Sequence, residues 1–136
     1  MADSFSKEER AAMKARAKEL KEQKTKEDGL KSVLAAISEM SGDERDTATR
    51  IHELVTEAAP DLAPKTYYGM PGWAKDGKVL VFFQGAEKFG TRYPTLGFND
   101  IAQLDDGNLW PVAFAIDKLG AAEEKKIAAL LKKAAG

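Results

Sequence analysis

The chain has no cysteine and only one histidine among its 136 residues. The absence of cysteine excludes disulfides, zinc–thiolate sites, iron–sulfur ligation and cysteine nucleophiles. His52 lies in a predicted helix, where we expect it at the polar edge on the surface, and no G-x-S-x-G motif accompanies it. A Ser-His-Asp triad therefore has no support, and glycine-rich phosphate-binding motifs are absent too. We expect a protein that is not an enzyme, although a carboxylate-only acid–base mechanism stays open.

Long hydrophobic runs and an excess of one charge are also missing. No apolar run approaches the roughly 18 residues that a membrane span needs, and the first twenty residues are charged. Lys and Arg total 21, Asp and Glu total 22, and the net charge is -1. This balance gives no global attraction to nucleic acid or to an anionic membrane. The sequence therefore predicts a cytoplasmic protein with no nucleic-acid and no membrane partner. Its oligomeric state is left open.

Helical patterns occupy the first part of the chain. Ser6 and Glu9 form a capping-box pattern ahead of a run rich in Ala, Lys and Glu, which predicts a first helix with a thin apolar face. Residues 1–27 are therefore interpreted as an N-terminal helical extension, and residues 28–136 as the main domain. A second capping-box pattern, at Ser41 and Glu44, separates two amphipathic helices. Their apolar positions are Leu30, Val33, Leu34, Ile37 and Met40, then Thr47, Ile51, Leu54, Val55 and Ala58.

The pattern changes to strands near Lys65. Asp76-Gly77 is typical of a two-residue hairpin turn, and the apolar run 79–83 after it predicts a central strand covered on both faces. Glycine and proline interrupt 89–98, which favours an edge or bulged strand there. Residues 99–104 fit a helical turn and 121–135 a closing helix. Further strands are expected at 65–70, at 72–75 and at 111–117, the last with Val112, Phe114 and Ile116 on one face. Helices first and strands next predict a single α+β domain with helices packed on a mainly antiparallel sheet.

A stripe of carboxylates is the first candidate site. Asp43, Asp46, Glu53 and Glu57 fall within an arc of about 80° on the predicted third helix, beside its apolar stripe. Oxygen-rich surfaces of this kind bind hard or borderline cations weakly, without a preformed cage. The alternative is an ordinary solvated face with Asp46 paired to Arg50.

An aromatic–basic cluster is the second candidate site. Nine of the eleven aromatic residues fall between positions 67 and 110, with basic side chains among them. Such a mixture can stack a planar ligand and hold its carboxylate or phosphate. The alternative is a sheet core that uses aromatic rings for volume. The candidate ligand-binding residues are Lys65, Tyr67, Tyr68, Met70, Trp73, Lys88, Arg92, Tyr93 and Trp110.

The segment T-Y-Y-G-M-P-G-W-A-K-D-G-K-V-L-V-F-F resembles the YdhG-like family of small bacterial domains. Tyr68, Gly69, Met70, Pro71 and Trp73 match its Y-G-M-P-x-[FWY] pattern, ahead of a hairpin and an apolar strand. The later A-E-K-F-G-T-R-Y-P and P-V-A-F-A-I-D segments also match, so the likeness covers about residues 28–135.

The resemblance implies helices packed on an antiparallel sheet. It also implies a frataxin-like iron chaperone, with iron as its cargo and iron–sulfur assembly proteins as partners. Three hypotheses follow: iron binding and delivery through the surface carboxylates, binding of a small anionic or planar ligand at the aromatic–basic cluster, and an adaptor role for the N-terminal helix.

Overall fold

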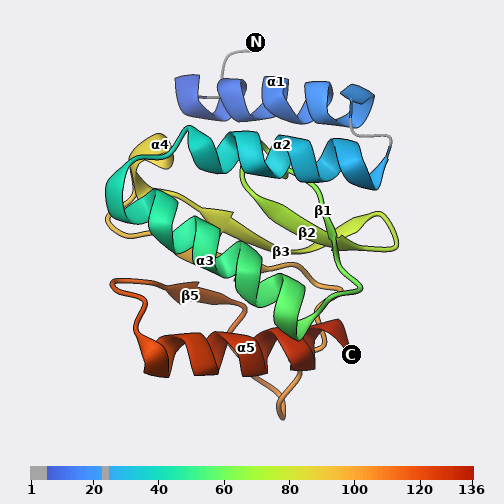
Figure 1. Cartoon of the computed structure of the whole chain (residues 1–136), viewed down its shortest axis with the longest axis vertical. Coiled ribbons are helices and arrows are strands. Elements are labelled where there is room, and N and C mark those ends of the chain that lie inside the picture. The colour runs from blue at the N-terminus through green and yellow to red at the C-terminus, as the bar shows by residue number, and fades with distance from the viewer. Residues whose placement is uncertain (1–5, 23–24) are drawn as a thin grey trace.

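The computed structural model describes residues 6–22 and 25–136, which form five helices and one five-stranded sheet (Figure 1). The predicted α+β domain is therefore confirmed. The helices are α1 (Lys7–Glu22), α2 (Lys26–Ser38), α3 (Gly42–Ala58), α4 (Ala86–Phe89) and α5 (Ala121–Ala135). The strands are β1 (Ala63–Pro64), β2 (Gly72–Lys75), β3 (Lys78–Gln84), β4 (Thr95–Phe98) and β5 (Ala113–Ala115).

The sheet is an antiparallel meander in which every strand pairs with the next one along the chain. Its order is β1-β2-β3-β4-β5, so β3 is the middle strand, as the apolar run predicts. The turn between β2 and β3 uses Asp76 and Gly77, both at positive φ, 51° and 82°. This is the backbone conformation that two-residue hairpins favour, and it confirms the prediction from the Asp-Gly pair.

The core lies between the sheet and three of the helices. In Figure 1, α3 crosses in front of the sheet between α2 and α5, and α1 lies outermost, beyond α2. Both α3 and α5 bury the apolar side of their patterns in this core, whereas α2 buries Val33 and Ile37 but leaves the predicted stripe residues Leu30 and Leu34 38% and 47% exposed. The core members include Val33 and Ile37 from α2, Ile51, Leu54 and Val55 from α3, Ile127 and Leu131 from α5, and Leu80, Phe83 and Leu96 from the sheet.

Two of the strand predictions are wrong. Residues 65–70 form no strand beyond an isolated bridge, because Tyr67 and Met70 close a tight turn through two mutual backbone hydrogen bonds. The expected edge strand at 89–98 divides into α4 and β4, since Gly90 takes a left-handed conformation that ends the helix. The strand β4 is internal, and β1 and β5 are the edges. At residues 99–104, where a helical turn is expected, the structure has a turn in which the Ala102 N–H donates to the Asn99 carbonyl at 3.0 Å.

Capping differs between the first and third helices. Ser6 and Glu9 make both reciprocal hydrogen bonds of the expected capping box, at 3.0 and 3.2 Å. Ser41 is the N-cap residue of α3, but its side chain makes no capping hydrogen bond, so the second capping box is absent.

The expected boundary after residue 27 falls inside α2, which begins at Lys26. Among the helices of the described segments, none has the length and apolar character needed to cross a membrane.

Candidate functional site

The four predicted carboxylates do not converge on one point. Glu53 and Glu57 each pair with Arg50, at 3.2 and 3.5 Å, and Arg50 also bonds Glu124 of α5 at 2.9 Å. The hydrogen bonds that Arg50 donates to Glu124 and Glu53 raise the pKa of its guanidinium above the ordinary value.

Arg50 thus uses the carboxylates to join α3 to α5, and the expected pairing with Asp46 is not among its described ion pairs. Asp43 and Asp46 take no part in these ion pairs, but they line a depression together with Arg50 and Glu124, which form one of the bridges. Within residues 6–22 and 25–136, no three His, Cys, Asp or Glu side chains are grouped closely enough to hold a metal ion.

Trp73 belongs to the core rather than to a binding surface. Its side chain is 1% exposed, and its Nε1 donates to His52 Nδ1 at 3.2 Å. The two rings stack with centroids 6.1 Å apart. His52 is thus half-buried against Trp73 rather than free on the surface, and Trp73 is corrected from ligand-binding candidate to core residue. Burial lowers the pKa of His52, while the charge of Glu53 acts in the opposite direction.

The other predicted ligand residues are dispersed. Lys65 Nζ donates to the Gly77 carbonyl and braces the hairpin, at 3.0 Å. Tyr93 is exposed beside Arg92, whose Cζ lies 5.4 Å from the ring centroid. Trp110 is half-buried and packs against the core. These side chains do not form one aromatic–basic pocket.

The paired tyrosines contact α1 instead. Tyr67 and Tyr68 meet edge to face with centroids 4.7 Å apart. The Arg16 guanidinium lies over both rings, with Cζ at 5.6 and 5.7 Å from their centroids. A cation over two tyrosine faces is an attractive arrangement, so this contact holds α1 against the domain. Two residues expected on the thin apolar face of this helix or just ahead of it, Leu20 and Phe5, have side chains outside the described part of the chain.

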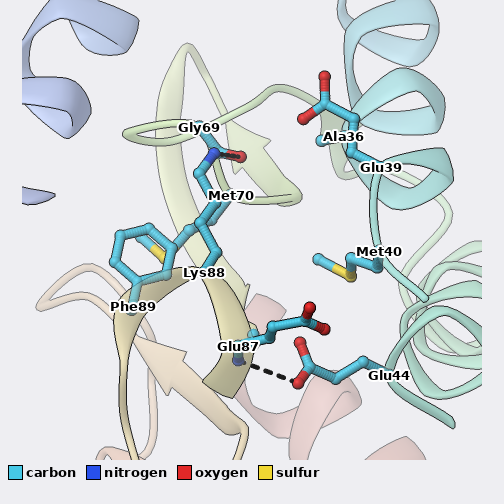
Figure 2. Close-up of a pocket in the computed structure, with 10 residues that line it drawn as sticks. Ala36, Glu39, Met40, Glu44, Gly69, Met70, Glu87, Lys88 and Phe89 are labelled. Atoms are coloured by element: carbon cyan, nitrogen blue, oxygen red, sulfur yellow. Dashed lines mark hydrogen bonds between the residues drawn. The ribbon is translucent and has the colours of Figure 1, made fainter. Parts of the chain in front are cut away.

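A cavity of about 330 Å³ lies next to the turn formed by residues 67–70, called here the tyrosine turn. It is large enough for a small ligand, and its apolar walls come from three separate elements. Met40 follows α2, Met70 ends the tyrosine turn, and Phe89 closes α4 (Figure 2). The lining residues are Ala36, Glu39, Met40, Glu44, Gly69, Met70, Gly85, Glu87, Lys88 and Phe89. Of the nine predicted ligand residues, Met70 and Lys88 are part of this site.

Two of the three carboxylates in the cavity are engaged with backbone or hydroxyl donors. Glu44 Oε2 accepts from the Glu87 backbone N–H at 3.1 Å, and Ser41 donates its hydroxyl to Glu87 Oε2 at 3.2 Å. Figure 2 shows the first of these contacts, with the Glu87 side chain extending toward Glu44 and Met40. These hydrogen bonds explain the missing capping box, because the side chains of Ser41 and Glu44 bond Glu87 of α4 instead of the backbone N–H groups of their own helix.

Two glycines allow the walls to approach one another. A Cβ at Gly85 would collide with the end of the Glu44 side chain, which would then have to move from its place against α4. At Gly69, a Cβ would lie 2.6 Å from Lys88 Nζ. Lys88 donates to the Gly69 carbonyl at 3.3 Å and so ties the tyrosine turn to α4. Both contacts fix the shape of the cavity.

The tyrosine turn is strained at one residue. Tyr68 has φ 52° and Gly69 has φ 80°, the same left-handed pair that Asp76 and Gly77 adopt in the hairpin. Asp and Asn tolerate this conformation, whereas a bulky residue held there costs roughly 1–2 kcal/mol. The Tyr68 ring contacts Tyr67 and Arg16, which are interactions that an aspartate could not make. Strain of this kind is concentrated at functional positions.

Most of the cavity was invisible to sequence reasoning. Glu44 fits a capping box and Met40 fits a helical stripe, so neither suggested a ligand site. Glu39 and Glu87 are two surface acids among many. The one usable signal was the unusual Tyr-Tyr-Gly-Met segment with Lys88 downstream. It marks the wall formed by Gly69, Met70 and Lys88, but not the side formed by α2 and the start of α3.

The comparisons with known proteins add no relationship. No family model, no curated protein and no solved structure matches the chain. The cavity must therefore be interpreted from its own chemistry.

Proposed function

We propose that this protein is a non-enzymatic binding protein whose cavity takes a small organic cation with an apolar body. The observation that supports this most is the meeting of Met40, Met70 and Phe89 with three carboxylates in about 330 Å³. Thioether and phenyl groups favour the apolar part of a ligand, and the carboxylates favour a positive charge at its rim.

The balance of charge argues for a cation rather than the anion suggested by the sequence. Glu39, Glu44 and Glu87 stand against the single ammonium of Lys88, which already donates to the Gly69 carbonyl. Glu44 and Glu87 are hydrogen-bonded within the protein, and Glu39 is exposed at the end of α2 with no side-chain hydrogen bond to any described residue. Glu39 is therefore the carboxylate best placed to pair with a ligand ammonium group.

Iron delivery and the YdhG-like resemblance stay predictions. Their support is the sequence pattern and the acidic face of α3, where two of the four predicted carboxylates are already paired with Arg50. The described residues contain no group of three side chains that could hold a metal ion, so a weak iron site would form only if carboxylates moved closer together. The organic-cation proposal needs no such rearrangement.

Methionine-methyl NMR tests the proposal directly. The chain has four methionines, of which Met40 and Met70 line the cavity and Met13 is exposed on α1. We expect phenethylamine to shift the Met40 and Met70 methyl signals and to leave Met13 unchanged. The neutral isostere 2-phenylethanol should bind more weakly, because it carries no charge for the rim.

Two variants sharpen the test. Glu39→Gln should weaken amine binding by about threefold, the size expected for an exposed charge pair. Asp46→Asn is the matched control, since Asp46 lies on α3 outside the cavity. If a panel of primary and quaternary amines leaves Met40 and Met70 unmoved at millimolar concentration, the proposed function is wrong. Equal binding of the amine and its neutral isostere would also contradict it.

A further inference from the structure

A second hollow lies between α1 and α4, next to the cavity. Its volume is about 570 Å³, and its walls come from the first half of α1, the end of β3 and α4, so it is called here the α1 hollow. Glu87, Lys88 and Phe89 line both spaces. The helix α4 is therefore a wall common to the cavity and the α1 hollow, while the other walls differ.

The α1 hollow has an excess of negative charge, as the cavity does. Three carboxylates line it, from Glu8, Glu9 and Glu87, and its one basic lining residue is Lys88, which the cavity shares. Glu9 accepts the Ser6 N–H at 3.2 Å in the capping box of α1. The side chain of Glu8 is exposed and makes no hydrogen bond or ion pair with a described residue.

Each space therefore has one carboxylate that is free to pair with a ligand, and each of these comes from a helix other than α4. Glu39 has this position in the cavity and Glu8 has it in the α1 hollow. The half-buried ring of Phe89 is common to both spaces. In Figure 2, Phe89 and Lys88 lie on one side of the cavity, and Glu39 and Met40 lie on the other. A carboxylate at each end and an aromatic ring between them match a ligand with two terminal cations and an apolar middle.

The position of Lys88 restricts the middle of such a ligand. Its ammonium lies 5.8 Å from the centroid of the Phe89 ring and donates to the Gly69 carbonyl at 3.3 Å. The common wall therefore carries a positive charge. A third cation at the centre of the ligand would be repelled there, whereas a hydrocarbon chain would not.

We propose that the ligand is a linear diamine with an uncharged hydrocarbon spacer, which extends from the cavity into the α1 hollow. This inference rests on the proposed function and specifies its ligand class. One ammonium pairs with Glu39, the other pairs with Glu8, and the spacer crosses Phe89. The width to be crossed is on the order of 10 Å, the diameter of a helix with its side chains.

The compound 1,8-diaminooctane is a suitable probe, because its extended chain can cross that width. On the full chain, we expect it to shift the methyl signals of Met40 and Met70 in the cavity and the amide signals of Glu8 and Ala12 in the α1 hollow. Phenethylamine has one charge and should shift the methionines alone. The shorter 1,4-diaminobutane cannot reach both carboxylates and should bind at least about threefold more weakly than 1,8-diaminooctane, which is the size of one exposed charge pair.

Spermidine separates this site from general attraction to acidic side chains. Its chain has the same length as that of 1,8-diaminooctane, but it carries an additional ammonium near the middle. We expect it to bind about threefold more weakly, because that ammonium faces Lys88. Attraction by surface charge alone would give the opposite order, since spermidine carries the larger charge.

Glu8→Gln tests the role of α1. It should weaken binding of 1,8-diaminooctane by about threefold and leave the affinity for phenethylamine unchanged. Glu27→Gln is the matched control, because Glu27 is an exposed acid in the first turn of α2, as Glu8 is in the first turn of α1, and it lines neither space.

The outcomes separate this inference from the proposed function. If 1,8-diaminooctane shifts Met40 and Met70 but not the amides of Glu8 and Ala12, the diamine inference is wrong and the amine site in the cavity stands. Tighter binding of spermidine than of 1,8-diaminooctane, or equal effects of Glu8→Gln and Glu27→Gln, would also overturn the inference. If no amine shifts either methionine, the proposed function fails and the diamine inference fails with it.

Discussion

Replacement of Trp73 by alanine tests whether the aromatic residues were correctly divided between core and surface. The side chain is 1% exposed and donates a hydrogen bond to His52. An aromatic side chain buries roughly 150–250 Å², which at about 25 cal/mol per Å² gives about 4–6 kcal/mol as an upper bound. Measured truncations of buried aromatics cost about 3–5 kcal/mol. We expect Trp73→Ala to lower the free energy of unfolding by about 4 kcal/mol.

Urea denaturation followed by far-ultraviolet circular dichroism is the suitable assay, because it does not depend on the fluorescence of the deleted indole. Tyr93→Ala is the control from the same predicted ligand set. Tyr93 is 42% exposed, so its removal should change stability by less than about 0.5 kcal/mol. If Trp73→Ala costs less than about 1.5 kcal/mol, well below the range for buried aromatics, Trp73 is not a core residue and the reasoning fails.

Three further predictions concern single positions. Because burial lowers the pKa of His52 below its ordinary 6.5, the unfolded chain takes up the proton first. The free energy of unfolding should therefore fall as pH drops below about 6.5, by about 1.4 kcal/mol for each unit of pKa difference, and His52→Gln should remove this component in urea titrations at several pH values. Gly85→Ala should displace the Glu44 carboxylate and so weaken its bond to the Glu87 N–H, which should shift the Glu87 amide signal and lower the free energy of thermal unfolding by about 1–2 kcal/mol. Glu44→Gln keeps an acceptor and should lower the free energy of unfolding much less. A double-mutant cycle measured by urea denaturation tests the contact between Tyr68 and Arg16. Tyr68→Asn should lower the free energy of unfolding by about 0.5–1 kcal/mol more in the native chain than in the Arg16→Ala variant, because only the native chain has the cation–π contact to lose. Equal losses in both backgrounds would show that the contact carries no energy.

The fold was predictable where local pattern and tertiary role agree. The apolar run of β3 and the Asp76-Gly77 turn each specify one structure, and both are found. Prediction failed where a local signal was satisfied by a distant partner. Ser41 and Glu44 have the spacing of a capping box, yet their side chains bond Glu87, more than forty residues away. No local pattern can reveal that choice, because α4 must first be placed beside α3.

Composition likewise predicted that aromatic and basic side chains would be used, but not how. Trp73 contributes volume and a hydrogen bond to the core, Lys65 braces a hairpin, and the paired tyrosines contact Arg16. The clustering of these residues along the chain therefore reflected several unrelated roles. Only a three-dimensional arrangement separates a ring that fills a core from a ring that lines a surface.

The strained tyrosine turn is where the separate features of this molecule meet. One side of the turn is contacted by Arg16 of α1, and the other contributes Gly69 and Met70 to the cavity. Lys88 bonds the carbonyl at the tip and lines the same cavity, so the turn cannot move without altering a cavity wall. An Asp-Gly or Asn-Gly pair would have formed this turn with less strain. The presence of tyrosine instead indicates that its ring contacts matter more here than an unstrained backbone, and it couples the N-terminal helix to the shape of the proposed binding site.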